Sequence, residues 1–262
     1  MKPHLLFLGA SDSQGVPRWW CECGICREAR TTGKNARTRP SILIEAEERV
    51  LVDAAPELRM QMTRESVRGV DAAIVTHAHN DHMLGLGDVG DQARWTRRPC
   101  PIYAPTEVLP QLVGRFAYML APQSRYRAWA PARPLENAGR QFAGYTVTGI
   151  RVPHGFNGWA YALRFQREGA SWAYMPDCLD LRDLAPWQNL DLLVLGASFY
   201  REDALKQNRS VYDVQEAREL VAALRPGRVI LTHLGHGVDV RKSAPEGMCY
   251  AKDGLRIELP WR

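Results

Sequence analysis

The sequence predicts an α/β protein in which strands outnumber helices and pack with them in layers. Short apolar runs that end at glycine, proline or polar turn residues recur along the chain, as expected for strands, and three segments place apolar residues at helical spacing. No internal repeat, low-complexity stretch or linker divides the 262 residues. We therefore expect one domain spanning residues 1–262.

The strands are expected at the short apolar runs. Two of these runs, 41–46 and 49–55, are joined by two glutamates, which is typical of a hairpin. The expected strands are 4–10, 41–46, 49–55, 72–77, 101–105, 145–154, 159–166, 171–177, 191–198, 228–235 and 255–259.

Helices are expected over 56–67, 106–120 and 213–224. Asp213 and Glu216 have the spacing of a capping box, so the third helix should begin at 213. Pro110, near the start of the second segment, weakens the case for a helix there.

The charge of the chain limits its partners. The formal net charge of +5 comes from arginines scattered along the sequence, whereas nucleic-acid binders usually concentrate basic residues on one stripe. A diffuse positive field favours a small anionic substrate, although charge alone does not separate this from an arginine excess without function. We therefore do not expect nucleic acid as a partner.

The N-terminal residues lack the apolar core of a signal peptide, and no apolar run approaches the roughly 20 residues needed to span a bilayer. We therefore expect a cytoplasmic protein without a membrane partner, in which clustered cysteines stay reduced and bind metal. The sequence does not determine the oligomeric state, and a homodimer is one of the alternatives that it leaves open.

Three of the seven histidines fall in THAHNDH at 76–82, directly after an expected strand. His77 and His79 project to the same side if the strand persists. Asp81 and His82 follow and can face a second centre. Imidazole nitrogens and carboxylates suit zinc, manganese or iron. A solvated histidine-rich turn is the alternative, but repulsion between protonated rings argues for a bound cation.

Three further potential ligands end other apolar runs. His154, Asp177 and His233 each stand at the C-terminal edge of an expected strand. Any one of them alone is more often an ordinary buried or surface residue. Together with the cluster they make seven ligands, enough for two metals that share a bridging carboxylate.

The segment HAHNDH matches the motif HxHxDH, and the later His, Asp and His follow in order, so the sequence resembles the metallo-β-lactamase superfamily. This resemblance implies an αβ/βα sandwich of two mixed sheets flanked by helices. It assigns the ligands as follows: His77, His79 and His154 for metal one, Asp81, His82 and His233 for metal two, and Asp177 as the bridge.

The chemistry that the resemblance implies is hydrolysis at two metals. Two neighbouring cations lower the pKa of a shared water, so a metal-bridging hydroxide forms at neutral pH and acts as the nucleophile. The cations also offset charge that develops in the transition state. Hydrolysis of an anionic phosphodiester is favoured most, because its oxygens can bind both metals. Asp81 is expected to belong to this catalytic centre.

Cys21, Cys23 and Cys26 lie within six positions near the N-terminus. His236, three residues after His233, can point away from the catalytic metals and complete a Cys₃His set, a standard structural zinc site. Three reduced cysteines on a loop and an unrelated histidine are the alternative.

The stretches LGASDSQGVPRWWCECGICREAR and VILTHLGH together resemble the PhnP family of phosphodiesterases. That family carries a structural zinc on a CxCxxC loop and a late histidine. The resemblance implies hydrolysis of small, often cyclic phosphodiesters, with manganese supporting activity. PqqB, a protein of pyrroloquinoline-quinone biosynthesis, has a similar N-terminal loop.

One position departs from the PhnP pattern. Where those enzymes carry a histidine thought to protonate the leaving oxygen, this chain has Val211. Valine cannot donate a proton, so Tyr212 is a candidate donor, unless the leaving group is acidic enough to need none. Further residues on loops near the ligands are candidates for shaping the pocket: Asn80, Asn157, Trp159, Tyr200 and Arg201.

Three functions follow from these patterns. The first is a phosphodiesterase with two manganese, zinc or iron ions and one structural zinc. The second is a hydrolase of lactones or thioesters on the same centre, and the third is a non-hydrolytic role in cofactor biosynthesis like that of PqqB. A tRNA-processing nuclease is disfavoured, because the sequence has no long inserted arm to grip tRNA.

Overall fold

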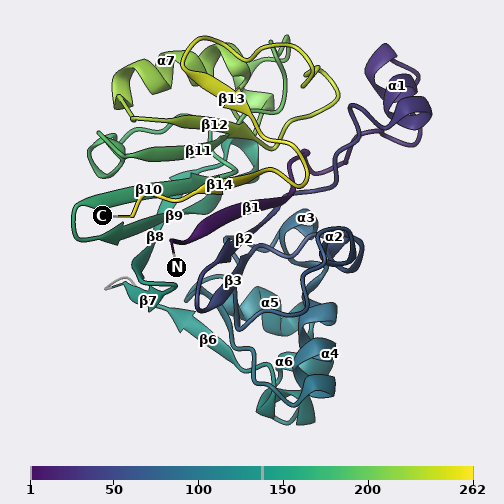
Figure 1. The fold of residues 1–262 in the computed structure, drawn as a ribbon, viewed down its shortest axis with the longest axis vertical. Coiled ribbons are helices and arrows are strands. Elements are labelled where there is room, and N and C mark those ends of the chain that lie inside the picture. The colour runs from purple at the N-terminus through teal and green to yellow at the C-terminus, as the bar shows by residue number, and fades with distance from the viewer. Residues whose placement is uncertain (1, 137–138, 262) are drawn as a thin grey trace.

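The computed structural model describes residues 2–136 and 139–261. Its strands form two mixed sheets of seven strands each (Figure 1). In spatial order, the first sheet contains β14 (Arg256–Glu258), β1 (His4–Gly9), β2 (Ser41–Glu45), β3 (Arg49–Val52), β4 (Ala72–Ile74), β5 (Ile102–Pro105) and β6 (Ala132–Leu135). The second contains β13 (Met248–Tyr250), β12 (Val229–Thr232), β11 (Leu192–Gly196), β10 (Ala170–Met175), β9 (Trp159–Arg167), β8 (Tyr145–Pro153) and β7 (Arg140–Phe142).

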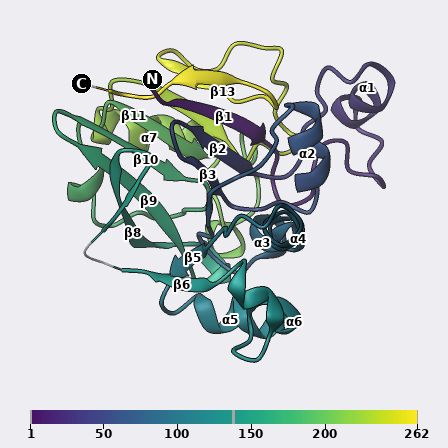
Figure 2. The same ribbon diagram turned by 60° about the horizontal axis from the view of Figure 1, so that its bottom comes forward.

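The helices cover the outer faces of the sheets, while α1 projects from the body in both views (Figures 1 and 2). The α-helices are α1 (Gly24–Thr32), α2 (Leu58–Arg64), α3 (Asn80–Met83), α4 (Leu86–Thr96), α5 (Leu109–Arg115), α6 (Ala117–Leu120) and α7 (Val214–Leu224). Short 3₁₀ turns are η1 (Arg125–Ala128), η2 (Gly155–Asn157), η3 (Ala185–Trp187) and η4 (Lys206–Asn208). No helix among the described residues is both long and apolar enough to cross a bilayer.

Three apolar clusters define four layers. The central cluster joins the inner faces of the two sheets through side chains such as Phe7 and Trp172. A second cluster packs the first sheet against helices α2, α4, α5 and α6, and a third packs the second sheet against α7. Each sheet therefore buries both faces, which explains why its strands appear in the sequence as continuous apolar runs.

All eleven expected strands are present, each with its bounds within a few residues of the prediction. The expected hairpin is also confirmed, because β2 and β3 pair antiparallel with Glu45 opposite Arg49. The sequence did not predict β6, β7 or β13. Strands β6 and β7 contain charged or polar residues and so do not form an apolar run, and β13 has only three residues.

The helix predictions were right in part. Helix α7 begins directly after Asp213, whose side chain forms the expected capping box with Glu216. The segment 106–120 instead divides into α5 and α6, because Phe116 leaves the helical conformation. The sequence did not predict α1, α3 or α4. Helix α4 contains Gly90, where a Cβ would lie 2.2 Å from the sulfur of Met119.

The strand directions bring the expected ligands to one edge. Strands β10, β11 and β12 run parallel, and β8 has the same direction because both β8 and β10 pair antiparallel with β9. In the first sheet, β3, β4 and β5 run parallel to one another. The carboxyl ends of parallel strands are the usual place for a site in α/β proteins.

Candidate metal centre

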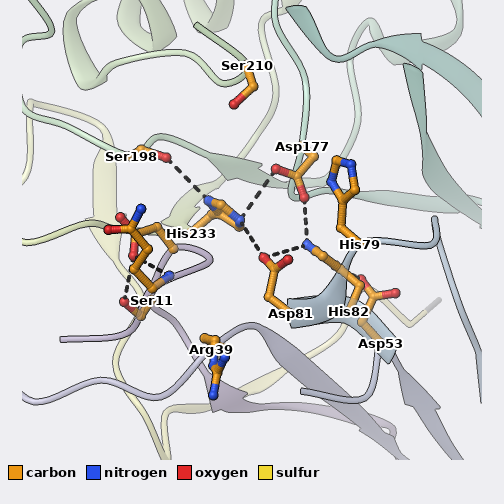
Figure 3. A network of polar contacts seen from close by, with 12 residues as sticks. Ser11, Arg39, Asp53, His79, Asp81, His82, Asp177, Ser198, Ser210 and His233 are labelled. Carbon is orange, nitrogen blue, oxygen red and sulfur yellow. Dashed lines mark hydrogen bonds and ion pairs between the residues drawn. The ribbon is translucent and has the colours of Figure 1, made fainter. Parts of the chain in front are cut away.

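The structure gathers all seven predicted ligand residues at the carboxyl ends of β4, β8, β10 and β12. Figure 3 shows His79, Asp81, His82, Asp177 and His233 of this set. After β4 the chain remains extended up to His79, the N-cap residue of α3, and then enters the helix at Asn80. This path sends His77 and His79 from a loop, and Asp81 and His82 from the first turn of α3, toward one place. Six of the seven residues are buried, and His79 is half-buried.

The first group consists of three histidines. Nδ1 of His79 lies 2.9 Å from Nε2 of His77 and 3.3 Å from Nε2 of His154. Metal–nitrogen bonds of about 2.0–2.1 Å at tetrahedral angles separate ligand nitrogens by about 3.3 Å. The three nitrogens therefore have the spacing of ligands around one cation.

The second group consists of Asp81, His82 and His233. Oδ2 of Asp81 lies 3.2 Å from Nε2 of His82 and 3.4 Å from Nε2 of His233. Asp177 lies between the two groups, since its Oδ2 is 2.7 Å from Nε2 of His82 and 3.6 Å from Nε2 of His77. This is the position that a bridging carboxylate requires.

Unpartnered polar atoms show that the residues fit a metal. Nε2 of His82, Nε2 of His233 and Oδ2 of Asp177 are buried, and none has a hydrogen-bond partner within the described part of the chain. A buried polar atom without a partner is costly. Because these atoms lie close together without hydrogen-bond geometry, they are suited to share cations, and the His and Asp clusters fit divalent metal binding.

Hydrogen bonds behind the cluster fix how the rings present their nitrogens. The Asp53 carboxylate accepts from Nδ1 of His82 at 2.7 Å, and the backbone oxygen of Ser210 accepts from Nδ1 of His154 at 2.8 Å. Thr76 donates to Asp53, so its hydroxyl oxygen accepts from Nδ1 of His77. With Nδ1 committed to these bonds, Nε2 is the nitrogen that each ring can offer to a bound cation, in its unprotonated form.

Burial and neighbouring charge shift the pKa values of these groups. Burial, followed by the charge of His82, lowers the pKa of His77 well below its ordinary value. Burial alone would raise the pKa of Asp177, but the imidazoles of His233, His154 and His82 hold it well below its ordinary value. A neutral His77 and an ionised Asp177 are the forms that bind cations.

Two residues of the centre have left-handed backbone conformations. Asp53 has φ 58° and His233 has φ 56°, which is uncommon for residues other than glycine. The backbone amide of Leu234 donates to Ala10, and that of Gly235 donates to Ser198, which holds the turn at His233. Such strain concentrates at functional sites.

The predicted structural zinc residues also meet. Nδ1 of His236 lies 3.2 Å from Sγ of Cys21 and 3.5 Å from Sγ of both Cys23 and Cys26. A tetrahedral zinc with bonds of about 2.3 Å to sulfur and about 2.0 Å to nitrogen separates these atoms by about 3.5 Å. The four side chains therefore fit one zinc ion, apart from the seven-residue centre.

Buried Arg37 holds the loop that carries both His233 and His236. Its guanidinium donates to the backbone oxygens of Leu234, Gly235 and Val238. Burial lowers the pKa of Arg37 to about 10, yet the group stays charged at neutral pH. Nothing local in the sequence distinguishes this residue from the other scattered arginines, so it was not predicted.

Two cavities adjoin the centre and share Ser13, Ser210 and His233. The first cavity, of about 400 Å³, contains five of the predicted ligands together with Ser13, Arg39, Asn80, Arg115, Asn157 and Ser210. The second, of about 320 Å³, is lined by Asp12, Ser13, Gln14, Arg18, Phe156, Ser198, Phe199, Glu202, Ala204, Asn208, Arg209, Ser210, Val211 and His233. The first is called the metal-side cavity and the second the outer cavity.

The structure places the remaining candidates unequally. Asn80 and Asn157 line the metal-side cavity as expected, whereas Trp159, Tyr200 and Arg201 line neither cavity. Arg39 and Arg115 were not predicted, since they lie far from the ligands in sequence and no motif contains them. Asp53 and Thr76, which orient the histidines, were also missed.

Tyr212 is not placed as the proton donor that the sequence suggested. Its side chain packs in the apolar cluster beneath α7, and its hydroxyl oxygen accepts a hydrogen bond from the amide of Leu181 at 2.7 Å. Burial raises its pKa, so the phenol does not release its proton near neutral pH. Val211, by contrast, lines the outer cavity.

Comparison with known proteins agrees with this geometry. Residues 48–234 match the family model of the beta-lactamase superfamily domain. An octanoyltransferase of Porphyromonas gingivalis is 27% identical over 243 residues, which cover 88% of this chain and 46% of that protein. A coenzyme PQQ synthesis protein B of Rhodopseudomonas palustris is 27% identical over 214 residues, covering 74% of this chain and 66% of that protein. The chain thus spans about half the length of one curated relative and about two thirds of the other.

Among solved structures, a diphosphatase of the PhnP family superposes with a TM-score of 0.85 at 26% identity, covering 99% of this chain and 98% of that one. The two sheets with their outer helices form the metallo-β-lactamase sandwich that the sequence predicted. The family match covers well over half of the chain. The chain therefore belongs to the beta-lactamase superfamily.

Proposed function

We propose that this protein is a metal-dependent hydrolase of small phosphodiesters. The observation that carries the proposal is the seven-residue donor set. Buried atoms of His82, His233 and Asp177 have no partner among the described residues, and five members of the set line an accessible cavity. Such a set serves to hold cations where a substrate can reach them.

The residues divide between two metals in this proposal. His77, His79 and His154 would hold one ion, and Asp81, His82 and His233 the other, with Asp177 between them. Two divalent cations in these positions would lower the pKa of a shared water and polarise the phosphoryl group. Manganese, zinc and iron all accept such a donor set.

The chain's own residues select an anionic substrate. Arg39 and Arg115 bring two permanent positive charges to the metal-side cavity. Asn80 and Asn157 add amide groups that can hold phosphoryl oxygens in place. The similarity to a PhnP-family diphosphatase, over nearly the full length of both chains, supports a phosphorus-centred reaction.

Hydrolysis of a lactone or thioester is the second candidate. The only support for an acyl substrate among the similarities reported above is the name of the octanoyltransferase, of which 46% is matched. The cavity argues against it. Within the described part of the chain, no aliphatic residue lines the metal-side cavity, so a long acyl chain would find no apolar contact there. A non-hydrolytic role like that of PqqB is the third candidate, and it is supported by the R. palustris relative.

The four cysteine and histidine side chains near α1 would hold a structural zinc ion in this proposal. Cys21 and Cys23 lie on the loop before α1, Cys26 lies on α1, and His236 lies on the loop after β12, so the ion would connect the N-terminal region to that loop. Because His236 is three residues from His233, this connection would also stiffen one wall of the metal centre.

A side-by-side assay tests the proposal. Protein reconstituted with Mn²⁺, Zn²⁺ or Fe²⁺ is expected to hydrolyse bis(p-nitrophenyl) phosphate and to leave nitrocefin, lactones and thioesters largely intact. His79→Ala should abolish turnover, whereas His4→Ala, which changes a histidine outside the centre, should not. Preferred cleavage of a lactone or thioester would contradict the phosphodiesterase assignment.

A further inference from the structure

Two further cavities adjoin the helices that cover the first sheet. One, of about 250 Å³, lies between α2 and α4, and its aliphatic and thioether side chains are Leu58, Met62, Val67, Val70 and Val89. The other, of about 310 Å³, has the charged side chains Arg49, Arg68, Asp71 and Arg98. They are called the apolar groove and the arginine cavity. Among the described residues, none that lines either of them also lines the metal-side cavity or the outer cavity.

The apolar groove and the arginine cavity share one wall. Arg68, Gly69, Val70 and Gln92 line both of them. The backbone of Val70 holds the side chain of Gln92 in place, because Oε1 of Gln92 accepts from the amide at 2.9 Å and its Nε2 donates to the carbonyl oxygen at 3.2 Å. This shared wall is therefore preorganised, and the two cavities form one recess with an apolar part and a charged part.

The charged part of the recess has an excess of positive charge. Within the part of the chain that the structure describes, the guanidinium groups of Arg49, Arg68 and Arg98 form no ion pair and no hydrogen bond. Asp71 is the only acidic residue among the described lining residues, and its Oδ2 accepts from the backbone amide of Arg49 at 2.8 Å. Three cations therefore surround one carboxylate, and an anion would offset their mutual repulsion.

This part lies at the edge of the sheet opposite to the metal centre. Arg49 opens β3, Asp71 directly precedes β4, and Arg98 lies shortly before β5. Because β3, β4 and β5 run parallel, these residues lie at the amino ends of the strands, whereas the metal ligands follow the carboxyl end of β4. A ligand in the recess would therefore bind apart from a substrate at the metals.

The two parts together indicate the class of ligand. Guanidinium groups bind oxyanions through paired N–H donors. The apolar groove offers buried and partly buried aliphatic side chains to a hydrocarbon chain that extends from the anion. Its rim carries Arg59 and Asp88, whose opposite charges cancel. A volume of about 250 Å³ lies below the about 300–1,000 Å³ of ordinary small-molecule sites, so the groove fits one short chain and not a lipid with two long chains.

We propose that the recess binds a free, single-chain anionic amphiphile. Its anionic group would lie among Arg49, Arg68 and Arg98, and its short hydrocarbon chain would lie between α2 and α4. A carboxylate, a phosphate monoester and a sulfonate share this chemistry. The inference goes beyond the proposed function and does not depend on it, because none of the seven metal-ligand residues lines the recess.

Calorimetry with 1-octanesulfonate tests the class of ligand. This probe has a fixed negative charge and no bond that a hydrolase cleaves, and it is used below its micelle concentration on zinc-loaded protein. We expect it to bind at least about tenfold more tightly than methanesulfonate, which lacks the chain, and than octyltrimethylammonium, which has the opposite charge. Equal affinity for the three probes, or no binding of octanesulfonate, would overturn the inference.

Variants place the probe in the recess. Arg68 lines both cavities and is exposed, so Arg68→Gln should keep the fold and weaken octanesulfonate binding by about tenfold. Met62→Gln should reduce the contribution of the chain. Arg218→Gln, at an exposed position of α7, and His79→Ala, in the metal centre, should leave the affinity unchanged. Loss of binding in His79→Ala with full binding in Arg68→Gln would place the probe at the metals and overturn the inference. Melting temperatures verify that each variant folds.

Two other occupants of the recess are distinguished by the same variants. If light scattering showed a dimer that Met62→Gln and Arg68→Gln both dissociate, the recess would be an interface between two copies of the chain. If the protein sedimented with phosphatidic acid vesicles through Arg68 but did not bind free octanesulfonate, the ligand would be a membrane surface. Either result would overturn the proposal, whereas a monomer that binds free octanesulfonate through Arg68 would support it.

Discussion

The Asp53 carboxylate lies 2.7 Å from Nδ1 of His82, and both side chains are fully buried. Asp53 follows strand β3 and has a left-handed backbone conformation, so its carboxylate turns toward α3 rather than along the sheet. Burial raises the pKa of Asp53, while the charge of His82 opposes this shift. The pair orients Nε2 of His82 toward the metal centre.

Replacing Asp53 should therefore weaken metal binding although Asp53 is not in either ligand group. Asp53→Ala removes the acceptor that fixes the tautomer of His82, and loss of such an outer contact typically lowers metal affinity about 10–100-fold. Titration with a competing chelator measures the change. Asp71→Asn, at an exposed aspartate before β4, is the control, and equal metal affinity in wild type and Asp53→Ala would refute the role of the pair.

The cysteine cluster predicts a separate zinc ion. Cys23→Ser should lower the zinc content by one ion per chain and lower the melting temperature, because the loop before α1 loses its connection to His236. Burial raises the pKa of Cys26 to about 11, so a bound cation is needed to keep that ligand ionised at neutral pH.

Cys249→Ser, at an exposed cysteine away from the cluster, should change neither the zinc content nor stability. A Cys23→Ser protein that kept its full metal content and its stability but lost activity would place the cysteines in the reaction instead.

Tyr212→Phe should leave turnover nearly unchanged. The phenol oxygen accepts from the amide of Leu181 and faces neither cavity, so its loss removes one buried hydrogen bond. The expected loss of unfolding free energy is about 1 kcal/mol. Thermal unfolding and the turnover rate on bis(p-nitrophenyl) phosphate measure the two quantities. If turnover dropped by the roughly hundredfold factor typical of a lost general acid while stability stayed unchanged, Tyr212 would be restored as a proton donor.

Because Asp213 forms the capping box of α7, we expect its replacement to lower stability without changing the chemistry at the metals. Asp213→Ala removes the carboxylate that accepts from the backbone amides of Glu216 and Glu202. Losing the cap alone costs about 1 kcal/mol. Glu219→Ala changes an exposed residue of the same helix and should cost much less. Chemical denaturation compares the two variants, and equal stability would show that the cap does not support the helix.

The sequence predicted the layers of the fold because both sheets are buried on both faces. Long apolar runs such as 191–198 became strands at the expected places. Strand β6 contains an arginine and a proline instead of an apolar run, and α4 contains Gly90, where packing against Met119 leaves no room for a Cβ. The local sequence pattern was therefore sufficient to predict the long strands, whereas elements that depend on tertiary packing could not be predicted from it.

The ligand set was predictable because four of its members lie within six consecutive positions and the other three end apolar runs. The residues that support the set were not. Asp53, Arg37 and Arg39 reach the site from distant loops, and only the folded chain shows that Asp53 meets His82 or that Arg37 holds the turn after β12. Tyr212 shows the opposite error, because adjacency to Val211 in sequence did not place it in the cavity.

The central claim is that the seven gathered residues hold two metal ions that the reaction requires. Its most direct test is to titrate metal-free protein with Mn²⁺ while following hydrolysis of bis(p-nitrophenyl) phosphate and metal content in parallel. We expect turnover to be absent in the metal-free protein and to rise until two ions are bound beyond the structural zinc. Full turnover of metal-free protein, or none after loading with manganese, zinc or iron, would contradict it.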